Sequence, residues 1–549
     1  MTDIQMSKFA ETILKQKYAH VKKDGQLEDW NNVAYRVSKN VLKAVHASPE
    51  QIKRTHEIIR DRKFIPGGRY LAATGRLFHQ VNNCFLFRAE DSREGWADLM
   101  QKGTLALMTG GGIGVDYSDV REEGKLIRKT GGTATGPIAL AQMLNEAGRF
   151  IMQGGSRRSA IWAGLKWSHP DIHKFIVLKN WIPEVREMKA KDYNFPATMD
   201  GTNISVLLND EFFEAYNNDK HELYSHAQGV YWATVRQMLK TGEPGFSIDT
   251  GKNSRETLRN ACTEVCSEDD SDVCNLGSIN MARITSLEEM AEVTELAVAF
   301  LLAGTVYSDI PFAKVDQVRT RNRRLGLGLM GLHEWLLVHG KKYEQDSDLE
   351  EYLKIYAKSG VMVKQYAKKW DLSQPVKTRA VAPVGSIGIL GETSTGIEPL
   401  FCAAYKRRYL KGSVWNYQYV VDPTAKRLIE SGVPAEKIED AYTLAEDVER
   451  RLAFQAWVQQ FVDHSISSTI NLPAWGSELN NDSKVRDFGN LLIKYLPRLR
   501  GITCYPDQAR PGQPLNPVSL TEALANEGHV YEESGTTVCD LTKGGECGS

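Results

Sequence analysis

Apolar residues recur every three or four positions through the first 65 residues of the chain. Positions spaced in this way share one face of a helix, so the pattern predicts amphipathic helices. The two runs consist of Leu14, Tyr18 and Val21, and then Trp30, Val33, Val37, Val41 and Val45. Pro66-Gly67-Gly68 ends the second run, because this combination favours a turn. We therefore expect a helical N-terminal segment over residues 1–65.

From residue 66 to about residue 515, short apolar runs alternate with longer stretches of helical periodicity. Asn203 to Leu208 is typical of a strand, whereas Glu288 to Leu302 and Leu349 to Trp370 are each typical of a helix. This alternation favours an α/β architecture. No internal repeat or low-complexity linker divides the region, so we expect one α/β domain over residues 66–515.

The composition changes near the C-terminus. Residues 526–549 are rich in Gly, Glu, Thr and Ser and poor in apolar residues. We therefore expect residues 516–549 to form a flexible C-terminal tail. This tail contains Cys539 and Cys547, two of the eight cysteines in the chain.

The overall composition is globular, with 42% hydrophobic and 25% charged residues in a chain of 549. The 68 basic and 69 acidic residues nearly cancel, which argues against a nucleic-acid coat protein, since such binding needs a basic surplus. The N-terminus lacks the apolar core of a signal peptide, and the longest apolar stretch, Leu296 to Tyr307, is too short to cross a membrane. Eight cysteines are too few for a disulfide scaffold, so we expect the reducing cytoplasm.

Four glycine-rich segments lie in the middle of the chain. Glycine lets backbone amides approach an anion closely, and such segments bind phosphate as well as forming tight turns. None has the spacing of a Walker loop or of a dinucleotide fingerprint. Together they indicate a nucleotide ligand; the segments are Gly110 to Gly114, Gly131 to Gly136, Gly154 to Arg158 and Pro383 to Gly396.

Three cysteines lie close together at Cys262, Cys266 and Cys274. They could be zinc ligands, although a structural zinc site usually has four ligands and a CxxC pair, which is absent here. They could also be buried free cysteines, which are common. A third interpretation uses their neighbours. On an extended loop Asn260, Cys262 and Glu264 point the same way, which places an amide, a thiol and a carboxylate base in one pocket.

This constellation resembles the catalytic subunit of ribonucleotide reductase. The NxCxE motif of that family is similar to Asn260, Cys262 and Glu264, and its redox pair is similar to Cys84 and Cys274. The resemblance runs from about residue 10 to the C-terminus. Further segments similar to family motifs, in the family's order, are Gln153 to Ile172, Pro383 to Pro399, His464 to Pro473 and Gly501 to Leu515.

The resemblance implies a ten-stranded α/β barrel with a finger loop through its centre. By the family mechanism, a thiyl radical on Cys262 takes the 3′ hydrogen of the ribose. Glu264 then removes the 3′-hydroxyl proton, Asn260 holds this hydroxyl, and the 2′-hydroxyl leaves as water. Cys84 and Cys274 supply the reducing equivalents and become a disulfide. Cys539 and Cys547 resemble the mobile pair that reduces this disulfide again.

The resemblance also implies a substrate site for the ribonucleotide. Its members are Asn83 and the phosphate-binding loop residues Val384, Gly385, Ser386 and Ile387. This loop departs from the family's common Pro-Thr-Gly-Thr pattern, since Val384 and Ser386 occupy the two threonine positions. Backbone amides do most of the anion binding in such loops, so Ser386 becomes the main hydroxyl donor.

Control of substrate specificity is implied as well. Asp91 and Ser92 match the position of an acidic contact to a deoxynucleotide or ATP effector. The loop linking effector to substrate is similar to Gly155, Ser156, Arg157 and Arg158. The first 60 residues are too short for a complete ATP-cone. The resemblance further implies a homodimer and a thioredoxin- or glutaredoxin-like reductant.

The radical source determines the cofactor. The oxygen-dependent class relays its radical through adjacent tyrosines, and this chain has no Tyr-Tyr pair, only Tyr505 on the matching strand. The Arg-x-x-Gly-Tyr motif of the glycyl-radical class is also absent. Several motifs, Pro-Gly-Gly-Arg among them, resemble the remaining class. This implies adenosylcobalamin as the cofactor, with no metal other than its cobalt.

Two alternatives stay open at this point. The chain could be the large subunit of a two-component reductase that needs a separate radical-generating subunit. It could also be an inactive, nucleotide-binding relative of the reductases. An inactive relative, however, would have no physical need to retain all of Asn260, Cys262, Glu264, Cys84 and Cys274.

Overall fold

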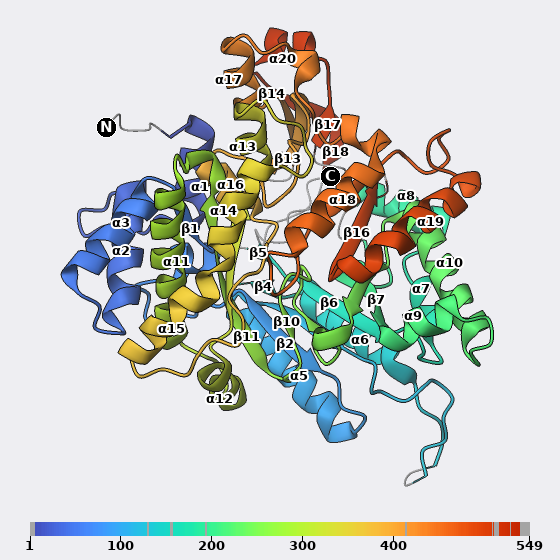
Figure 1. The fold of residues 1–549 in the computed structure, drawn as a ribbon. Helices are drawn as coiled ribbons and strands as arrows, with labels where there is room; N and C mark the ends of the chain where they lie inside the picture. The colour runs from blue at the N-terminus through green and yellow to red at the C-terminus, as the bar shows by residue number, and fades with distance from the viewer. Residues whose placement is uncertain are drawn as a thin grey trace.

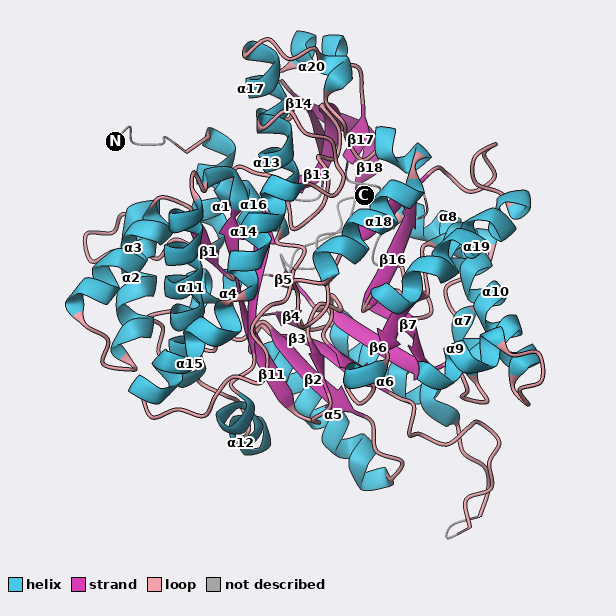
Figure 2. Ribbon diagram, in the orientation of Figure 1, coloured by secondary structure: helices cyan, strands magenta, loops and turns pink. Residues whose placement is uncertain are grey.

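The computed structural model of the chain describes residues 6–128, 131–153, 157–192, 195–411, 414–507, 509, 515–527 and 529–537. One large sheet lies at its centre with helices around it, and a smaller sheet projects from one end (Figure 1). Figure 2 shows the same arrangement, with the strands gathered inside and the helices outside.

The N-terminal segment consists of three helices, α1 (Lys8–Lys17), α2 (Trp30–Lys43) and α3 (Pro49–Arg60). The side chain before each helix accepts a hydrogen bond from a backbone N–H of the first turn, which stabilises the helix start. Most of the predicted apolar positions are buried, but Val21 lies beyond the end of α1 and is 69% exposed. The helical prediction for this segment is confirmed.

The large sheet has ten strands. Strands β2, β3, β6, β7 and β8 run parallel in it, whereas β11 pairs antiparallel with β2 and β16 pairs antiparallel with β8. Helices cover the sheet, and this explains why the sequences of these strands are continuous apolar runs. Their order is β1 (Phe64–Pro66), β11 (Asp272–Asn280), β2 (Cys84–Arg88), β3 (Gly112–Asp116), β6 (Ile161–Lys166), β7 (Thr202–Asn209), β8 (Gly245–Asp249), β16 (Gly501–Pro506) and β15 (Thr469–Leu472), with β12 (Leu325–Met330) paired to β11.

Backbone hydrogen bonds connect β12 to the segment that precedes β15, at the other side of the sheet. The Leu327 N–H donates to the Thr378 carbonyl at 2.8 Å, which attaches residues 378–381 to β12. The His464 N–H donates to the Arg379 carbonyl at 3.0 Å, and the chain from 464 leads directly into β15. The sheet therefore closes on itself, as the predicted barrel requires.

Helices surround the barrel in two groups. One apolar core lies beneath the N-terminal helices and α11, and another lies beneath α5, α6 and α10. The helices after the N-terminal segment are α4 (Gly68–Ala73), α5 (Arg93–Met108), α6 (Gly136–Arg149), α7 (Ile172–Ile176), α8 (Pro183–Lys191), α9 (Asp210–Asn217), α10 (Tyr224–Thr241), α11 (Leu287–Tyr307), α12 (Ala313–Asn322), α13 (Leu332–Val338), α14 (Ser347–Ala357), α15 (Ser359–Lys369), α16 (Gly385–Gly391), α17 (Pro423–Glu430), α18 (Val448–Gln459), α19 (Val485–Tyr495) and α20 (Leu520–Asn526).

Two predicted elements differ from the structure in their boundaries. The stretch Leu349 to Trp370 forms two helices, α14 and α15, because a tighter turn at Lys358 interrupts it; the Lys358 N–H bonds to the Ile355 carbonyl at 2.9 Å. The predicted helix over Glu288 to Leu302 is longer, as α11. Although α11 is apolar and long enough to cross a membrane, 72% of its most apolar window is buried in the protein, as in a core helix.

The region predicted as a flexible tail begins with folded elements. A second sheet has the order β17 (Leu515–Pro517), β13 (Ala404–Lys411), β14 (Val414–Val421) and β18 (Val530–Thr537), and α20 packs against β14. The free edges of the β13–β14 hairpin are thus each covered by a strand from beyond residue 515. The tail boundary at residue 516 therefore needs correction, because backbone pairing extends to Thr537.

Candidate active site

A short hairpin crosses the interior of the barrel. Its strands are β9 (Leu258–Arg259) and β10 (Cys266–Ser267), and β9 contacts β2, β3 and β6. The passage is narrow, because a Cβ atom at Gly114 of β3 would overlap the carbonyl oxygen of Arg259. The hairpin can therefore pass only where β3 carries no side chain, which places its tip, residues 260–265, inside the barrel.

The tip is a turn rather than an extended loop. The Thr263 N–H bonds to the Asn260 carbonyl at 3.1 Å, and Thr263 has a φ of 68°, a left-handed conformation that is costly for a β-branched residue. We expected Asn260, Cys262 and Glu264 to point the same way because the loop is extended. That reason is wrong, since the backbone forms a turn here. The turn nevertheless directs all three into one cavity.

Two contacts from outside the hairpin hold the tip. The Ser465 N–H donates to the Glu264 carbonyl at 2.9 Å, and the Cys266 N–H donates to the His464 Nδ1 at 3.2 Å. His464 is fully buried, and burial together with nearby cations holds its pKa well below its usual range. The ring is therefore neutral, with a lone pair on Nδ1 to accept this bond. The sequence motif around His464 thus anchors the hairpin tip.

The cavity at the hairpin tip has a volume of about 200 Å³. Its wall contains residues of the hairpin tip and also both parts of the predicted substrate site, namely Asn83 and the loop 384–387. The predicted residues among its lining are Asn83, Cys84, Asn260, Cys262, Glu264, Val384, Gly385, Ser386 and Ile387. Residues far apart in sequence therefore converge on a space large enough for part of a polar substrate.

Glu264 is the main titratable group of the cavity. Its side chain is buried, Oε1 lies 4.0 Å from the Cys84 sulfur, and Oε2 has no hydrogen-bond partner among the described residues. Burial raises the pKa of Glu264 to about 7. A carboxyl group whose pKa lies near neutral pH, and which has one oxygen without a hydrogen-bond partner among the described residues, is suited to accept a proton from a bound hydroxyl.

Cys84 and Cys274 lie opposite each other in the register of β2 and β11. The Asn260 side-chain amide donates to the Cys84 sulfur at 3.0 Å, so the thiol pair is connected to the hairpin tip. Burial, and next the Glu264 carboxyl, raise the pKa of Cys84 well above its usual range, and burial does the same for the pKa of Cys274. Both sulfurs are free thiols, and directly paired strand positions suit disulfide formation.

The predicted phosphate loop forms one end of the cavity. Val384 has a φ of 20°, a strained value for a β-branched residue, and it precedes α16. Ser386 is hydrogen-bonded to the Tyr18 hydroxyl at 2.7 Å. At the other side, the Asn83 Oδ1 is buried without a hydrogen-bond partner among the described residues. The cavity therefore offers unused polar atoms where a ligand would lie.

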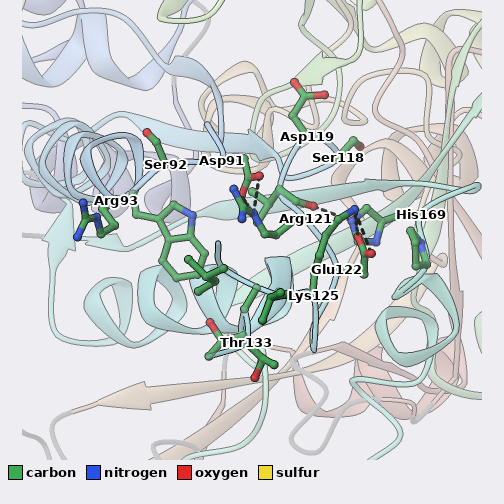
Figure 3. Close-up of a pocket in the computed structure, with 18 of the residues that line it drawn as sticks. Asp91, Ser92, Arg93, Ser118, Asp119, Arg121, Glu122, Lys125, Thr133 and His169 are labelled. Atoms are coloured by element: carbon green, nitrogen blue, oxygen red, sulfur yellow. Dashed lines mark hydrogen bonds and ion pairs between the residues drawn. The ribbon is translucent and has the colours of Figure 1, made fainter. Parts of the chain in front are cut away.

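A second, larger cavity of about 1120 Å³ contains the predicted effector residues. Figure 3 shows Asp91 and Arg121 paired side by side in its wall; the Arg121 Nε is 2.8 Å from an Asp91 oxygen. Ser92 caps α5 by accepting the Gly95 N–H at 2.9 Å. Among the residues that the structure describes, the cations that line this cavity are Arg93, Arg121, Lys125, Arg128 and Lys166, and the carboxylates that line it are Asp91, Glu94, Asp119 and Glu122.

The remaining predicted residues belong to the segment 155–158 and to the C-terminal region. Arg157 and Arg158 form β5, which pairs with β4 (Met152–Gln153), and Gly155 and Ser156 lie outside the described residues. Cys539 and Cys547 also lie outside them. Among the described residues, no three His, Cys, Asp or Glu side chains come together as a metal site. Cys266, Cys402 and Cys504 are buried and do not line the active-site cavity.

Sequence reasoning missed part of the cavity wall. Gly67 and Gly68 line it, although the sequence indicated only a helix break there. A Cβ atom at Gly67 would lie 2.8 Å from the Asn83 Oδ1, so the glycine leaves room for that side chain. Tyr18 and His464 were also missed, because each acts through a tertiary contact that no local pattern reveals.

Comparisons with known proteins identify the family that the chain is similar to. Residues 82–231, 221–357 and 376–497 match the family model for the ribonucleotide reductase barrel domain. A vitamin B12-dependent ribonucleoside-diphosphate reductase of Thermoplasma acidophilum is 24% identical, with 96% of this chain and 74% of the relative aligned. One of the same name from Mycobacterium tuberculosis is 26% identical, with 95% and 82% aligned. A ribonucleoside-diphosphate reductase large subunit of Plasmodium falciparum is 25% identical over 61% of this chain and 47% of the relative.

Proposed function

Because the chain belongs to the ribonucleotide reductase family, we propose that it reduces ribonucleoside diphosphates or triphosphates to 2′-deoxyribonucleotides with adenosylcobalamin as its cofactor. The observation that carries this proposal is the single cavity shared by the hairpin tip, Cys84 and the 383–387 loop. The relatives named for vitamin B12 align over nearly the whole chain. This alignment favours their chemistry over that of the large subunit of a two-component enzyme.

The proposed reaction assigns one task to each side chain. A radical on the Cys262 sulfur takes the 3′ hydrogen of the ribose, and the Glu264 carboxylate accepts the 3′-hydroxyl proton while Asn260 holds that oxygen. The 2′-hydroxyl leaves as water. Cys84 and Cys274 give up two hydrogen atoms and form a disulfide, so one ribonucleotide and two thiols yield one deoxyribonucleotide, water and the disulfide.

Cys262 is the cysteine that a radical-donating cofactor would have to reach. Among the six described cysteines, Cys262 is the one that is not buried. Small residues also line the active-site cavity, and these are Gly110, Gly112, Ala160 and Ala261. When bound, adenosylcobalamin would supply a carbon-centred radical that generates the thiyl radical on Cys262. The barrel would shield that sulfur from solvent.

The decisive test is an assay of the purified chain alone, without oxygen and in dim light. It contains ribonucleotide, dithiothreitol, effector nucleotides and adenosylcobalamin. We expect deoxynucleotide that forms only when the cofactor is present. An active preparation that needs no cobalamin, or a preparation that stays inactive until a second radical-generating subunit is added, would favour the two-component alternative.

We further propose that the 1120 Å³ cavity binds a nucleoside triphosphate effector, with its phosphates near the cations that line the cavity. Arg121→Ala should weaken binding of thymidine triphosphate about 10- to 100-fold, because a hydrogen bond to a charged group is lost. Calorimetry measures this directly. Lys174→Ala is the matched control, since Lys174 pairs with Glu123 but does not line the cavity. Equal binding by the wild type and Arg121→Ala would refute the assignment.

We also propose that the chain forms a homodimer through the same region. Met108 of α5, Met143 of α6 and Phe150 are exposed apolar residues at 57%, 48% and 81%. The effector cavity lies at the start of both helices, whereas these side chains lie in the middle or at the far end, so a second copy that packs along the length of both helices would reach the cavity. Sedimentation should show a dimer for the wild type and a monomer for the double variant Met143→Glu, Phe150→Glu. Val361→Glu, which replaces an exposed apolar residue of α15, should remain dimeric. A wild-type monomer would contradict the proposal.

The reductant also belongs to this proposal, as does the reducing cytoplasm suggested by the free thiols. Cys539 and Cys547 would carry electrons from a thioredoxin- or glutaredoxin-like protein to the Cys84–Cys274 pair. Cys547→Ser should keep its activity with dithiothreitol, which reaches the disulfide directly, and lose most of it with thioredoxin. Equal loss with both reductants would argue against the tail as a carrier.

A further inference from the structure

Ser386 is the sole hydroxyl side chain in the loop from Pro383 to Gly388. It lines the active-site cavity together with Gly385 and Ile387. In the proposed function this hydroxyl faces the substrate phosphates. The orientation of one serine side chain therefore matters more here than in a loop with two hydroxyl residues.

Tyr18 holds that serine from the other side. It follows α1 directly, its side chain is 5% exposed, and its hydroxyl lies 2.7 Å from the Ser386 Oγ. The phenol also lies against the cavity wall, because a Cβ atom at Gly68 would be 3.1 Å from the Tyr18 hydroxyl. A residue of the N-terminal segment, outside the matched barrel region, thus contacts the phosphate end of the site.

Helix α1 is fastened at both ends to the element that carries Ser386. At its start, the Ser7 N–H donates to Glu392 Oε1 at 2.8 Å, and Glu392 also pairs with Arg62 at 2.7 Å. At its end, Tyr18 bonds to Ser386. The position of the phenol is therefore fixed relative to α16, and the hydrogen bond is part of the folded framework.

A bound phosphate would determine which of the two hydroxyl groups donates this hydrogen bond. Phosphate oxygens only accept hydrogen bonds, so Ser386 must donate its single hydroxyl hydrogen to them. The serine oxygen can then accept the hydrogen of the Tyr18 phenol. Two hydrogen bonds in series polarise each other, which strengthens the bond to the phosphate.

We propose that Tyr18 is a positioning residue of the substrate's phosphate subsite, which orients Ser386 by donating a hydrogen bond to it. The proposal rests on the proposed function. It assigns to the N-terminal helix a role in substrate binding, through a group that does not touch the reacting carbons. The loss of the phenol hydroxyl therefore affects KM and leaves kcat nearly unchanged.

The test compares Tyr18→Phe, Ser386→Ala and the double variant in the full chain. Tyr18→Phe should raise KM for the ribonucleotide about 3- to 10-fold, the effect of one neutral hydrogen bond, with kcat within about 2-fold of the wild type. In the Ser386→Ala background the same change should have no further effect. Tyr356→Phe is the matched control, because its buried hydroxyl bonds to the Leu327 carbonyl away from the cavity, and its KM should not change.

A second measurement needs no tyrosine variant. Inorganic diphosphate added to the wild-type chain should slow amide hydrogen exchange in residues 8–18, and Ser386→Ala should lose this protection. An unchanged KM in folded Tyr18→Phe, an additive effect in the double variant, or protection that persists in Ser386→Ala would overturn the proposal. Failure of the proposed function would look different, since the wild type would then form no deoxynucleotide at all.

Discussion

Cys262→Ser is expected to abolish deoxynucleotide formation while the protein still binds its nucleotides. The thiol is the only described cysteine side chain that reaches the cavity without being buried, so no neighbour can replace it. A hydroxyl group has the same shape but does not form a usable radical under the same conditions. We expect a decrease in kcat of at least about 10⁴-fold, as for other groups that act as a unit with their neighbours.

The measurement is product formation in the anaerobic assay, with substrate binding followed separately by calorimetry. Cys402→Ser is the matched control: Cys402 is also a free cysteine but bonds to the Ala404 carbonyl, away from the active-site cavity. It should keep most of the wild-type activity. Substantial reduction by Cys262→Ser would exclude the thiyl mechanism, whereas loss of nucleotide binding would indicate a damaged fold rather than lost chemistry.

Glu264→Gln should have the second largest effect. The carboxylate is the base of the proposed reaction, and its loss should lower kcat about 10²- to 10⁴-fold. Since burial raises the pKa of Glu264 to about 7, the wild-type kcat/KM should rise with pH and level off above a midpoint near 7. The glutamine variant should lack this rise. A variant that keeps both the activity and the pH dependence would show that another group is the base.

The same substitution should stabilise the protein at high pH. The pKa of Glu264 is higher in the folded protein than the ordinary value of 4.5, so the folded state holds the proton more tightly. The free energy of unfolding therefore decreases as the pH rises from about 4.5 through about 7. Above that range Glu264→Gln should be more stable than the wild type by about 3 kcal/mol, which chemical denaturation at pH 8 and pH 5 can measure. No gain at pH 8 would contradict the buried, ionised carboxylate.

Much of the fold could be predicted from periodicity, because burial on one or both faces leaves a regular trace. The strand around Asn203 and the helix around Leu296 are examples, with errors confined to their ends. The break at Lys358 left no such trace, since helical spacing continues across it. Likewise, the pairing of β17 and β18 with β13 and β14 depends on strands more than 90 residues apart in sequence, which local composition could not indicate.

The candidate site divides in the same way. Asn260, Cys262 and Glu264 could be found because they are close in sequence and chemically unusual. The link from Cys84 to Cys274 came from resemblance alone, and the register of β2 and β11 now places them together. The roles of His464 and Tyr18 could not be found from the sequence. The resemblance included the segment that starts at His464 without giving this residue a task, and Tyr18 fitted the apolar face of a helix. Their roles depend on which atoms the closed barrel places beside them.

The hairpin that passes Gly114 is held at its tip by segments that are synthesised late, and this affects the chain during its synthesis. A protein is synthesised from its N-terminus, so β2 to β8 and the hairpin itself exist before residues 464–467 and β16 have been added. Until then the hairpin lacks Ser465 and His464, whose hydrogen bonds hold Glu264 and Cys266. An unfinished or truncated chain would therefore carry the reactive thiol without the enclosure that directs a radical to substrate. The position of these late segments would thus link the onset of radical chemistry to the completion of synthesis.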